Sequence, residues 1–548
     1  MRDLATLVDA LRFQVESRPA AVCCTFEADD ALIDITYASL MERASAFRMV
    51  LASRDVKPGD IIFVLLPHCP DLLYSFVGTI LAGCTPAFLA PPSEKQDPAV
   101  YRDTLAHLFD NTRARALVID AVTLAEIGDI SIEGFQVVEP AQQLGVRSQV
   151  RWPAPTPDDT AFLQFSSGTT GLRKGAMLTH RIVMEQVRTY AGAIDLSPDH
   201  DRIVSWLPLY HDMGLIACLI MPLSTGVPVT LIDPLEWVYD PAMLFRAIAR
   251  DGGTLAWLPN FAFNHLVRTV RSSEAGDLSR MRAFIDCSEP CKAASLEAFA
   301  KAFALAGARL DQMQTCYAMA EAVFAVTQSP VGTPPRVLSI DLQALSEGLV
   351  TILDGGTPLV SVGTFLPGFS GRILGPNFED CPPGRVGEIA IRGPSLFGGY
   401  YRSPEASAEP FHEGWFRTGD LGFICENYLY VTGRIKDVII AYGRNFYSHD
   451  IEAIANAVAD VKPGRAVAFG LYNDGAGSED VIVVAETEAA DSAVHSRISA
   501  EIKRLVLENL NLSVARVVLV KPKWLLKTSS GKINRAANAD KYRSHLEI

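Results

Sequence analysis

Short apolar runs alternate with amphipathic segments along most of the chain, and this alternation constrains the fold more than any other feature. The runs IIFVLLP, DRIVSWLP, GVPVTLID and GTLAWLPN are rich in β-branched and aromatic residues. Segments between them, such as PAMLFRAIARDG and SLEAFAKAFALAG, have helical patterns. Strands and helices in alternation predict parallel sheets covered by helices.

The pattern changes twice, and the length of 548 residues also predicts more than one domain. From about Val386, short strands separated by turn signals predict an antiparallel or barrel-like part. After Gly433, strands and one long helix predict a compact α+β unit. We therefore expect an α/β protein with a large N-terminal domain over 1–433, made of parallel sheets layered with helices plus the barrel-like part. A small, mobile α+β domain is expected over 434–548.

Composition narrows the partners and the compartment. The net charge of −14 disfavours nucleic acid. The ten cysteines form no C-x-x-C pair, which favours a reducing, cytoplasmic setting over disulfides or a zinc site. The most apolar stretch is interrupted by His68, Pro70 and Asp71, so we expect a buried strand and helix there and no membrane span.

The segment SSGTTGLRKG, from Ser166 to Gly175, directly follows the apolar run AFLQF. Glycines allow backbone N–H groups to converge on an anion, and the hydroxyls and Lys174 add donors and positive charge. The natural ligand of such a loop is a polyphosphate. The Walker spacing GxxxxGK[ST] is absent, and a Gly/Ser loop alone also fits a flexible linker.

Further motifs support the phosphate loop. Five motifs follow one another over nearly the whole chain: LQFSSGTTGLRKGAMLTH, CYAMAEA, GWFRTGDLG, YVTGRIKDVI and KTSSGKINR. Together they resemble the signature motifs of the adenylate-forming superfamily of acyl-CoA synthetases, fatty acyl-AMP ligases and peptide-synthetase adenylation domains. This resemblance implies two half-reactions. A carboxylate and ATP give acyl-AMP and pyrophosphate, and a thiol then displaces AMP.

The resemblance also implies roles for individual residues. Glu321 and Thr170 would hold Mg²⁺, Lys532 would bridge the carboxylate and the α-phosphate, His211 would lie at the mouth of the acyl pocket, and Lys436 would be the hinge. Trp257, Phe261 and Phe263 would line that pocket. The ATP- and AMP-binding residues would be Ser166, Ser167, Gly168, Thr169, Thr170, Gly171, Lys174, Ser288, Glu289, Pro290, Tyr317, Asp420 and Arg434.

Plain alternatives exist for several of these residues. Lys532 also fits an exposed turn lysine, Asp420 a turn cap, and Glu321 a surface helix residue. His211, Tyr317 and Phe263 also fit an ordinary core. The chain departs from the usual motifs, with Arg173 where proline is common and Ala318 where glycine is common, but neither departure removes a chemical group.

Four other segments are most similar in sequence to the fatty acyl-AMP ligase branch. They are PLYHDMGLIA, LPNFAFNHL, CSEPCKAASLEAF and GRNFYSHDIEAI. A stretch of extra length around Ser339 to Pro358 resembles the insertion of that branch and is expected against the small domain. This branch implies a fatty acid substrate and an acyl carrier protein as acceptor. The alternatives are an acyl-CoA synthetase using free CoA, or a nucleotide-binding relative without turnover.

The C-terminal stretch is locally basic. From Arg516 onward, eight Lys and Arg residues face only Asp540 and Glu547. The stretch fits either a solvated surface or a site for an anion or acidic partner, and an acidic carrier protein is such a partner.

Overall fold

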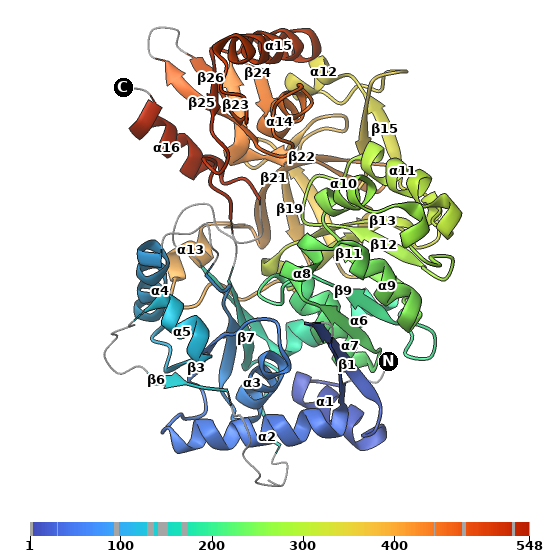
Figure 1. Ribbon diagram of the computed structural model, residues 1–548, viewed down its shortest axis with the longest axis vertical. Helices are drawn as coiled ribbons and strands as arrows, with labels where there is room; N and C mark the ends of the chain where they lie inside the picture. Colours follow the sequence, from blue (N-terminus) through green and yellow to red (C-terminus); the bar gives the residue numbers. More distant parts are fainter. Residues whose placement is uncertain are drawn as a thin grey trace.

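The protein is described from a computed structural model. It describes residues 4–29, 31–92, 98–128, 136–140, 152–165, 174–442, 444–473, 478–528 and 532–546. In Figure 1 the chain up to about residue 330 fills the lower and middle parts of the molecule, and the elements after residue 434 lie above it, next to the segment around residues 337–346.

A sheet of fourteen strands forms the backbone of the large part of the molecule. Its central strands are parallel neighbours in the order β13, β12, β11, β9, β10 and β1, and β2 pairs antiparallel at the edge. The bounds are β1 Val22–Ala28, β2 Ala31–Thr36, β9 Ile203–Ser205, β10 Val229–Ile232, β11 Leu255–Leu258, β12 Ala283–Asp286 and β13 Met313–Ala318. Because parallel strands share their carboxyl ends, the residues after β9, β11, β12 and β13 meet at one edge, where ligands of such sheets bind.

Antiparallel strands continue this same sheet, and they begin at Ala325, well before the start near Val386 that the sequence predicts. Beyond β13 the order is β14, β17, β22, β21, β19 and β18, and β20 pairs with β21. The bounds are β14 Ala325–Gln328, β17 Thr364–Phe365, β18 Ser370–Leu374, β19 Gly387–Arg392, β20 Phe411–His412, β21 Trp415–Cys425 and β22 Tyr428–Arg434. Among the described strands this part is an open extension of the sheet, so the expected barrel-like part takes the form of antiparallel strands at one end.

A second sheet is parallel throughout, in the order β4, β3, β5 and β6. Its strands are β3 Ile61–Leu65, β4 Thr85–Phe88, β5 Ala116–Ile119 and β6 Gln136–Val138, next to the hairpin β7 Thr160–Phe165 and β8 Gly175–Thr179. All five residues of β3 are buried. Burial on both faces explains why this strand reads as a continuous apolar run.

Helices cover both sheets (Figure 1). Many begin at side-chain caps. Asp120, for example, accepts from the N–H groups of Val122 and Thr123. Their bounds are α1 Leu7–Ser17, α2 Tyr37–Ser53, α3 Pro70–Leu81, α4 Pro98–Thr112, α5 Ala121–Ile127, α6 His180–Ala193, π-helix η1 Met213–Ile220, α7 Met221–Thr225, α8 Pro234–Tyr239, α9 Ala242–Asp251, α10 Asn260–Thr269, α11 Ala293–Ala302 and α13 Pro404–Ala408. Short 3₁₀ turns are η2 Ser272–Glu274, η3 Ala304–Ala306, η4 Leu310–Gln312, η5 Ala320–Ala322 and η6 Ile435–Asp437.

The C-terminal part has hydrophobic cores of its own. Its strands β25 Ala466–Asn473, β26 Ser478–Glu486 and β27 Arg516–Val520 form one sheet, and β23 Val438–Ala441 pairs with β24 Arg444–Tyr447. Alternate residues of β25 and β26 point to opposite faces. One set packs with α14 Ser448–Asn456 and α15 Ser492–Leu510, and the other packs with Tyr542 of α16 Arg535–Leu546. This sandwich follows the α+β pattern expected after Gly433.

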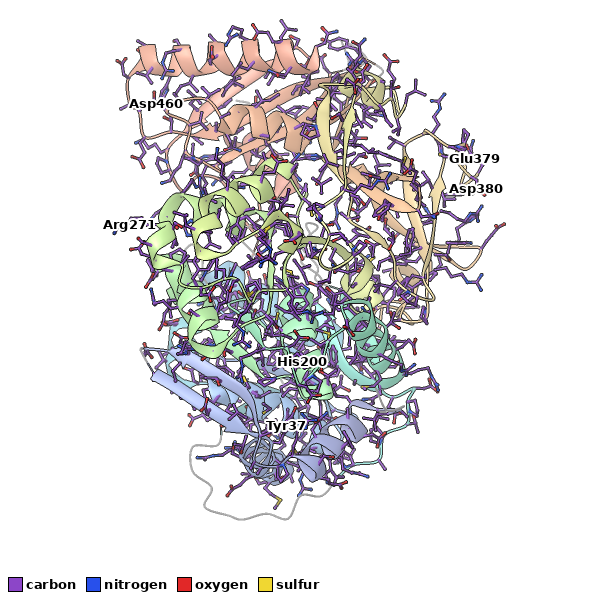
Figure 2. The ribbon with its side chains drawn as sticks, turned by 90° about the vertical axis from the view of Figure 1, so that its right-hand side faces the viewer. Tyr37, His200, Arg271, Glu379, Asp380 and Asp460 are labelled. Carbon is purple, nitrogen blue, oxygen red and sulfur yellow. The ribbon has the colours of Figure 1, made fainter. Side chains whose placement is uncertain are left out.

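Figure 2, turned by 90°, shows the same arrangement from the side. Asp460 lies in the C-terminal part and Tyr37 toward the opposite end, while Glu379 and Asp380 mark the turn between β18 and β19. The overall architecture is therefore the mixed α/β fold that the sequence predicts.

Candidate active site

Three residues of the predicted nucleotide site meet at the end of β13, to which Tyr317 belongs. The hydroxyl of Tyr317 donates to Oδ2 of Asp420 at 2.6 Å, and Nε of Arg434 donates to Oδ1 of the same carboxylate at 2.8 Å. Asp420 and Arg434 are direct partners in the antiparallel pair β21–β22, which fixes their approach. Burial, followed by the Asp420 charge, raises the pKa of Tyr317 well above its ordinary value. The phenol therefore stays protonated and is a donor to the carboxylate.

Glu321 follows β13 in the 3₁₀ turn η5. Its Oε1 accepts a hydrogen bond from the Tyr400 hydroxyl at 2.6 Å, and it is partly exposed. Val323, two residues on, has φ +67°, a left-handed conformation unusual for a β-branched residue. Strained backbone of this kind concentrates at functional sites.

His211 and Asp212 lie in the turn between β9 and the π-helix η1. Asp212 caps this helix, because its Oδ1 accepts from the Met213 N–H at 2.8 Å. Gly214 allows the helix to start against the preceding turn, since an added Cβ there would overlap the Pro208 carbonyl. The ring of His211 lies 4.7 Å from that of Tyr210. π-helical turns are frequent at functional sites.

The segment after β12 forms another wall of the site. Ser288 has φ +71°, and its Oγ lies 3.9 Å from Sδ of Met213. The Glu289 side chain accepts from the Phe261 N–H at 3.0 Å, so its charge caps the start of α10. Pro290 is exposed.

Lys532, from the C-terminal part, reaches this wall. Its ammonium donates a hydrogen bond to the Ser288 carbonyl oxygen. Burial raises the pKa of Asp212; the Met213 N–H and the Lys532 charge oppose the shift, and the Glu321 charge adds to it. Lys532 and Glu321 are therefore each near enough to Asp212 to affect its carboxyl group electrostatically.

Other contacts hold the Lys532 loop in place. Arg535 donates to both oxygens of Glu452 at 2.8 and 2.7 Å and to Asp437 at 2.6 Å. Asp437 belongs to η6, the turn that also holds the predicted hinge Lys436, which is exposed. The C-terminal motif is thus tied to the segment that links the two parts of the chain.

Of the predicted phosphate loop, only Lys174 and Gly175 lie within the described residues. Ser166, Ser167, Gly168, Thr169, Thr170 and Gly171, with Arg173, lie outside the described residues. Lys174, directly before β8, places its ammonium 5.2 Å from the centre of the Tyr400 ring. Tyr400 therefore contacts both Lys174 and Glu321.

The three predicted acyl-pocket aromatics lie in different surroundings. Trp257 is fully buried and donates to the Tyr190 hydroxyl at 2.9 Å. Phe263 is fully buried, edge-on to Phe299 at 5.2 Å. Phe261 is 41% exposed, and its ring lies 6.0 Å from Trp206. Their part in acyl binding stays a prediction, and Phe261 is the member open to solvent.

The extra segment lies against the C-terminal part. It folds as β15 Val337–Ile340, α12 Leu342–Ser346 and β16 Thr357–Val360. The Ser346 hydroxyl accepts from Arg444 Nε at 3.0 Å and from Nη2 at 2.8 Å. Ile340 and Leu345 pack with Tyr447 in one buried cluster. This packing confirms the position that the sequence predicts for the segment.

The carboxylate oxygens at this site are suitable ligands for a Mg²⁺ ion that is bound mainly through the phosphates of the substrate. Mg²⁺ prefers oxygen and is usually bound by one or two carboxylates together with phosphates. Glu321 supplies a partly exposed carboxylate, and Asp212 is close to it electrostatically. Over the described residues there is no cluster of three His, Cys, Asp or Glu side chains able to hold a metal alone.

Comparison with known proteins agrees with this geometry. The model of a family described as AMP-binding enzyme matches residues 11–401. The chain belongs to this AMP-binding enzyme family. The family match and the relatives described below identify the protein as an adenylate-forming ligase of the fatty acyl-AMP ligase branch.

Relatives of this AMP-binding enzyme carry related names. A putative fatty-acid–CoA ligase of Mycobacterium leprae is 32% identical over 88% of each chain. A long-chain-fatty-acid–AMP ligase of Mycobacterium marinum is 30% identical over 97% of this chain and 96% of the other. A medium-chain-fatty-acid–[acyl-carrier-protein] ligase of Moorena producens is 30% identical over 98% and 94%.

Solved structures confirm the fold of the AMP-binding enzyme. One from a study of fatty acyl-adenylate ligases of E. coli and L. pneumophila has a TM-score of 0.91 at 29% identity, covering 99% of this chain and 98% of the other. The L. pneumophila fatty acyl-adenylate ligase bound to acyl adenylate and pyrophosphate has a TM-score of 0.76 at 28% identity, covering 99% and 97%. In the part of the chain that is described, no helix has the length and apolarity that a membrane span requires.

Tyr400 and Asp212 were not found from the sequence. Asp212 adjoins the selected His211, and Tyr400 stands in GGYYRSPE without a motif to mark it. Only the distance of 2.6 Å to Glu321 shows its importance. The Glu452–Arg535 pair was missed for the same reason, because it joins residues far apart in sequence.

Proposed function

We propose that this ligase activates a fatty acid with ATP and passes the acyl group to the phosphopantetheine thiol of an acyl carrier protein. The main support for this proposal is the position of the Lys532 ammonium group, which donates to the Ser288 carbonyl near Asp212 and Glu321. A cation from the C-terminal part thus lies among the groups expected to hold ATP. The names of the relatives support the fatty acid and the carrier.

In the first half-reaction a carboxylate oxygen forms a bond to the α-phosphorus of ATP, and the bond to pyrophosphate breaks. Asp420, oriented by Arg434, would accept from the ribose hydroxyls, and the Tyr317 ring would stack on adenine. Lys532 would neutralise charge on the carboxylate and α-phosphate together, which is the main task in phosphoryl chemistry. Mg²⁺, when bound at Glu321, would neutralise the other phosphate oxygens.

In the second half-reaction the thiolate sulfur bonds to the acyl carbon and AMP leaves. We infer that residues 434–548 form a mobile domain that rotates about Lys436 between the two steps. The exposed η6 turn and the separate cores on either side support this division. His211 would lie at the mouth of the acyl pocket, with Phe261 at its exposed side.

The contact between α12 and β24 favours a carrier over CoA. Arg444 bonds to Ser346, and Tyr447 packs with Ile340 and Leu345. These contacts oppose rotation of the C-terminal part, so an acceptor that binds only after full rotation would react slowly. A carrier can contribute its own binding energy to the rotation, which free CoA does less well.

The ten cysteines are free, which supports a reducing, cytoplasmic setting.

Two assays test the proposal. ATP–pyrophosphate exchange with fatty acids of increasing chain length is expected to show acid-dependent exchange, and its absence with every acid would leave a nucleotide-binding relative. Thioester formation is then compared with CoA and with a holo-carrier at equal concentrations. We expect a much higher kcat/KM for the carrier. Efficient turnover with CoA would place the protein among acyl-CoA synthetases.

A further inference from the structure

One strip of chain, from Ser395 to Tyr401, contacts the turn that holds Glu321. The Phe397 N–H donates to the Glu321 carbonyl at 2.8 Å, and the Ser395 hydroxyl donates to the Ala322 carbonyl at 3.3 Å. Ser395 is itself buried. These bonds fix the backbone on which the Glu321 carboxylate is carried.

The same strip pairs with the strand that leaves the phosphate loop. The Tyr401 N–H donates to the Gly175 carbonyl at 2.8 Å, and the Met177 N–H donates to the Gly399 carbonyl at 3.0 Å. An isolated bridge joins Ala176 to Tyr400. Two parts of the site more than a hundred residues apart in sequence are therefore joined through this strip.

Tyr400 adds side-chain contacts to both parts. Its hydroxyl donates to Glu321 Oε1 at 2.6 Å, and the Lys174 ammonium lies 5.2 Å from its ring centre. The ring is 9% exposed and packs edge-on to Phe397 at 4.8 Å. Burial, followed by the Glu321 charge, raises the pKa of Tyr400 above its ordinary value, so the hydroxyl keeps its proton and donates.

We propose that Tyr400 is a positioning residue for the metal–phosphate site: its hydroxyl holds Oε1 of Glu321, which leaves Oε2 for the metal, and its ring holds Lys174 toward the phosphates. The inference rests on the proposed function, because Glu321 is the expected metal carboxylate. A hydrogen bond to a charged group is among the stronger ones in proteins. Fixing both groups before ATP arrives removes an ordering cost from binding.

The test is metal binding measured apart from turnover. Mn²⁺ affinity is determined by electron paramagnetic resonance in the presence of a non-hydrolysable ATP analogue. Tyr400→Phe keeps the ring and removes only the hydroxyl, and we expect the Kd for Mn²⁺ to rise roughly tenfold. Tyr239→Phe is the matched control, because Tyr239 is exposed at the end of α8, outside the strip, and the variant is expected to leave the Kd unchanged.

A double-mutant cycle separates positioning from a general structural effect. If Tyr400 acts through Glu321, Tyr400→Phe adds little to the loss caused by Glu321→Gln. A merely structural role gives additive losses.

Tyr400→Leu also removes the ring beneath Lys174, and we expect the Kd for the ATP analogue without metal to rise about fivefold, whereas Tyr400→Phe leaves it near the parent value.

Each outcome is decisive. An unchanged Mn²⁺ Kd in folded Tyr400→Phe, or additive losses in the cycle, overturns the role of the hydroxyl. An unchanged Kd for the ATP analogue in folded Tyr400→Leu overturns the role of the ring. Failure of the proposed function is a separate result, since the parent protein would then show no acid-dependent pyrophosphate exchange.

Discussion

At the scale of the residue, the site combines charges brought from distant positions. Lys532 contacts a carbonyl 244 residues away in sequence, and Asp420 accepts from a tyrosine 103 residues away. Substitution of single residues therefore separates their contributions to the two half-reactions.

Lys532→Ala is expected to abolish acyl-AMP formation and spare thiol transfer from supplied acyl-AMP. Losing a charge aimed at the developing anion costs about 3–4 kcal/mol, or a hundredfold or more in rate. The measurement is pyrophosphate exchange beside single-turnover transfer from acyl-AMP. Lys503→Ala, at an exposed position of α15, is the control. Exchange within a few-fold of the parent rate would show the assignment to be wrong.

His180 gives a prediction about pH. It is buried, and its Nδ1 accepts from the Leu7 N–H at 3.3 Å. Burial lowers the pKa of His180 to about 4, against the opposing charges of Asp159 and Asp9. The unfolded chain, with a pKa near 6.5, then binds the proton first as pH falls. The free energy of unfolding therefore decreases as the pH falls from about 6.5 to about 4.

The contribution of this group is about 2 kcal/mol at pH 5 relative to pH 7. Glutamine at position 180 does not titrate in this range. Between pH 7 and pH 5, His180→Gln is therefore expected to lose about 2 kcal/mol less stability than the parent protein. Urea unfolding of both proteins at the two pH values measures the difference. Equal losses in parent and variant would contradict the role assigned to His180.

At the scale of the element, two short segments connect the large and C-terminal parts. The η6 turn carries Lys436, and α12 meets β24 through Ser346 and Arg444. One is expected to permit rotation and the other to oppose it.

Lys436→Pro is expected to leave adenylation largely intact and to slow thioester formation. The 3₁₀ turn closes through the Val438 N–H to the Ile435 carbonyl, so proline at 436 removes no bond from it. Proline does fix φ, which hinders the conformational change. Lys436→Ala is the control, and both half-reactions are measured separately. Equal loss in both half-reactions of a folded variant would argue against a hinge here.

Arg444→Ala is expected to increase thioester formation with CoA several-fold and to preserve acyl-AMP formation. It removes two hydrogen bonds to Ser346 while the apolar contacts of Tyr447 remain, which is why the gain is limited. Arg504→Ala, on the exposed face of α15, is the matched control. No gain with CoA would indicate that this pair does not restrain the C-terminal part.

At the scale of the whole molecule, charge is distributed unevenly. The net charge is −14, yet the C-terminal stretch is basic. Several of its cations are paired within the fold, such as Arg535 with Glu452 and Arg543 with Asp540. Lys521 and Lys523 are exposed and remain the best candidates for an acidic carrier.

Replacing Lys521 and Lys523 together by glutamate is expected to lower kcat/KM for the carrier about tenfold at low salt. The loss should fall as salt is added, because steering acts through association and is screened. Acyl-AMP formation is the internal control. A carrier reaction of the parent that is insensitive to salt would remove the role of these lysines and leave the acceptor standing.

The antiparallel strands between Ala325 and Leu374 could not be predicted from the sequence. Local patterns were enough to predict the α/β class, the antiparallel strands after Val386 and the α+β character after Gly433. These follow from local periodicity, which depends on which face of each strand or helix is buried. The sequence also marked Lys532, Asp420, Tyr317 and Glu321 through their motifs.

Which side chains meet depends on the tertiary structure. Tyr400 bonds to Glu321, Arg444 to Ser346 and Arg535 to Glu452, and none of these pairs is marked by spacing along the chain. It also separated Phe261, which is exposed, from Trp257 and Phe263, which are fully buried. Pairings of this kind depend on how distant elements pack, and local patterns in the sequence carry no record of that packing.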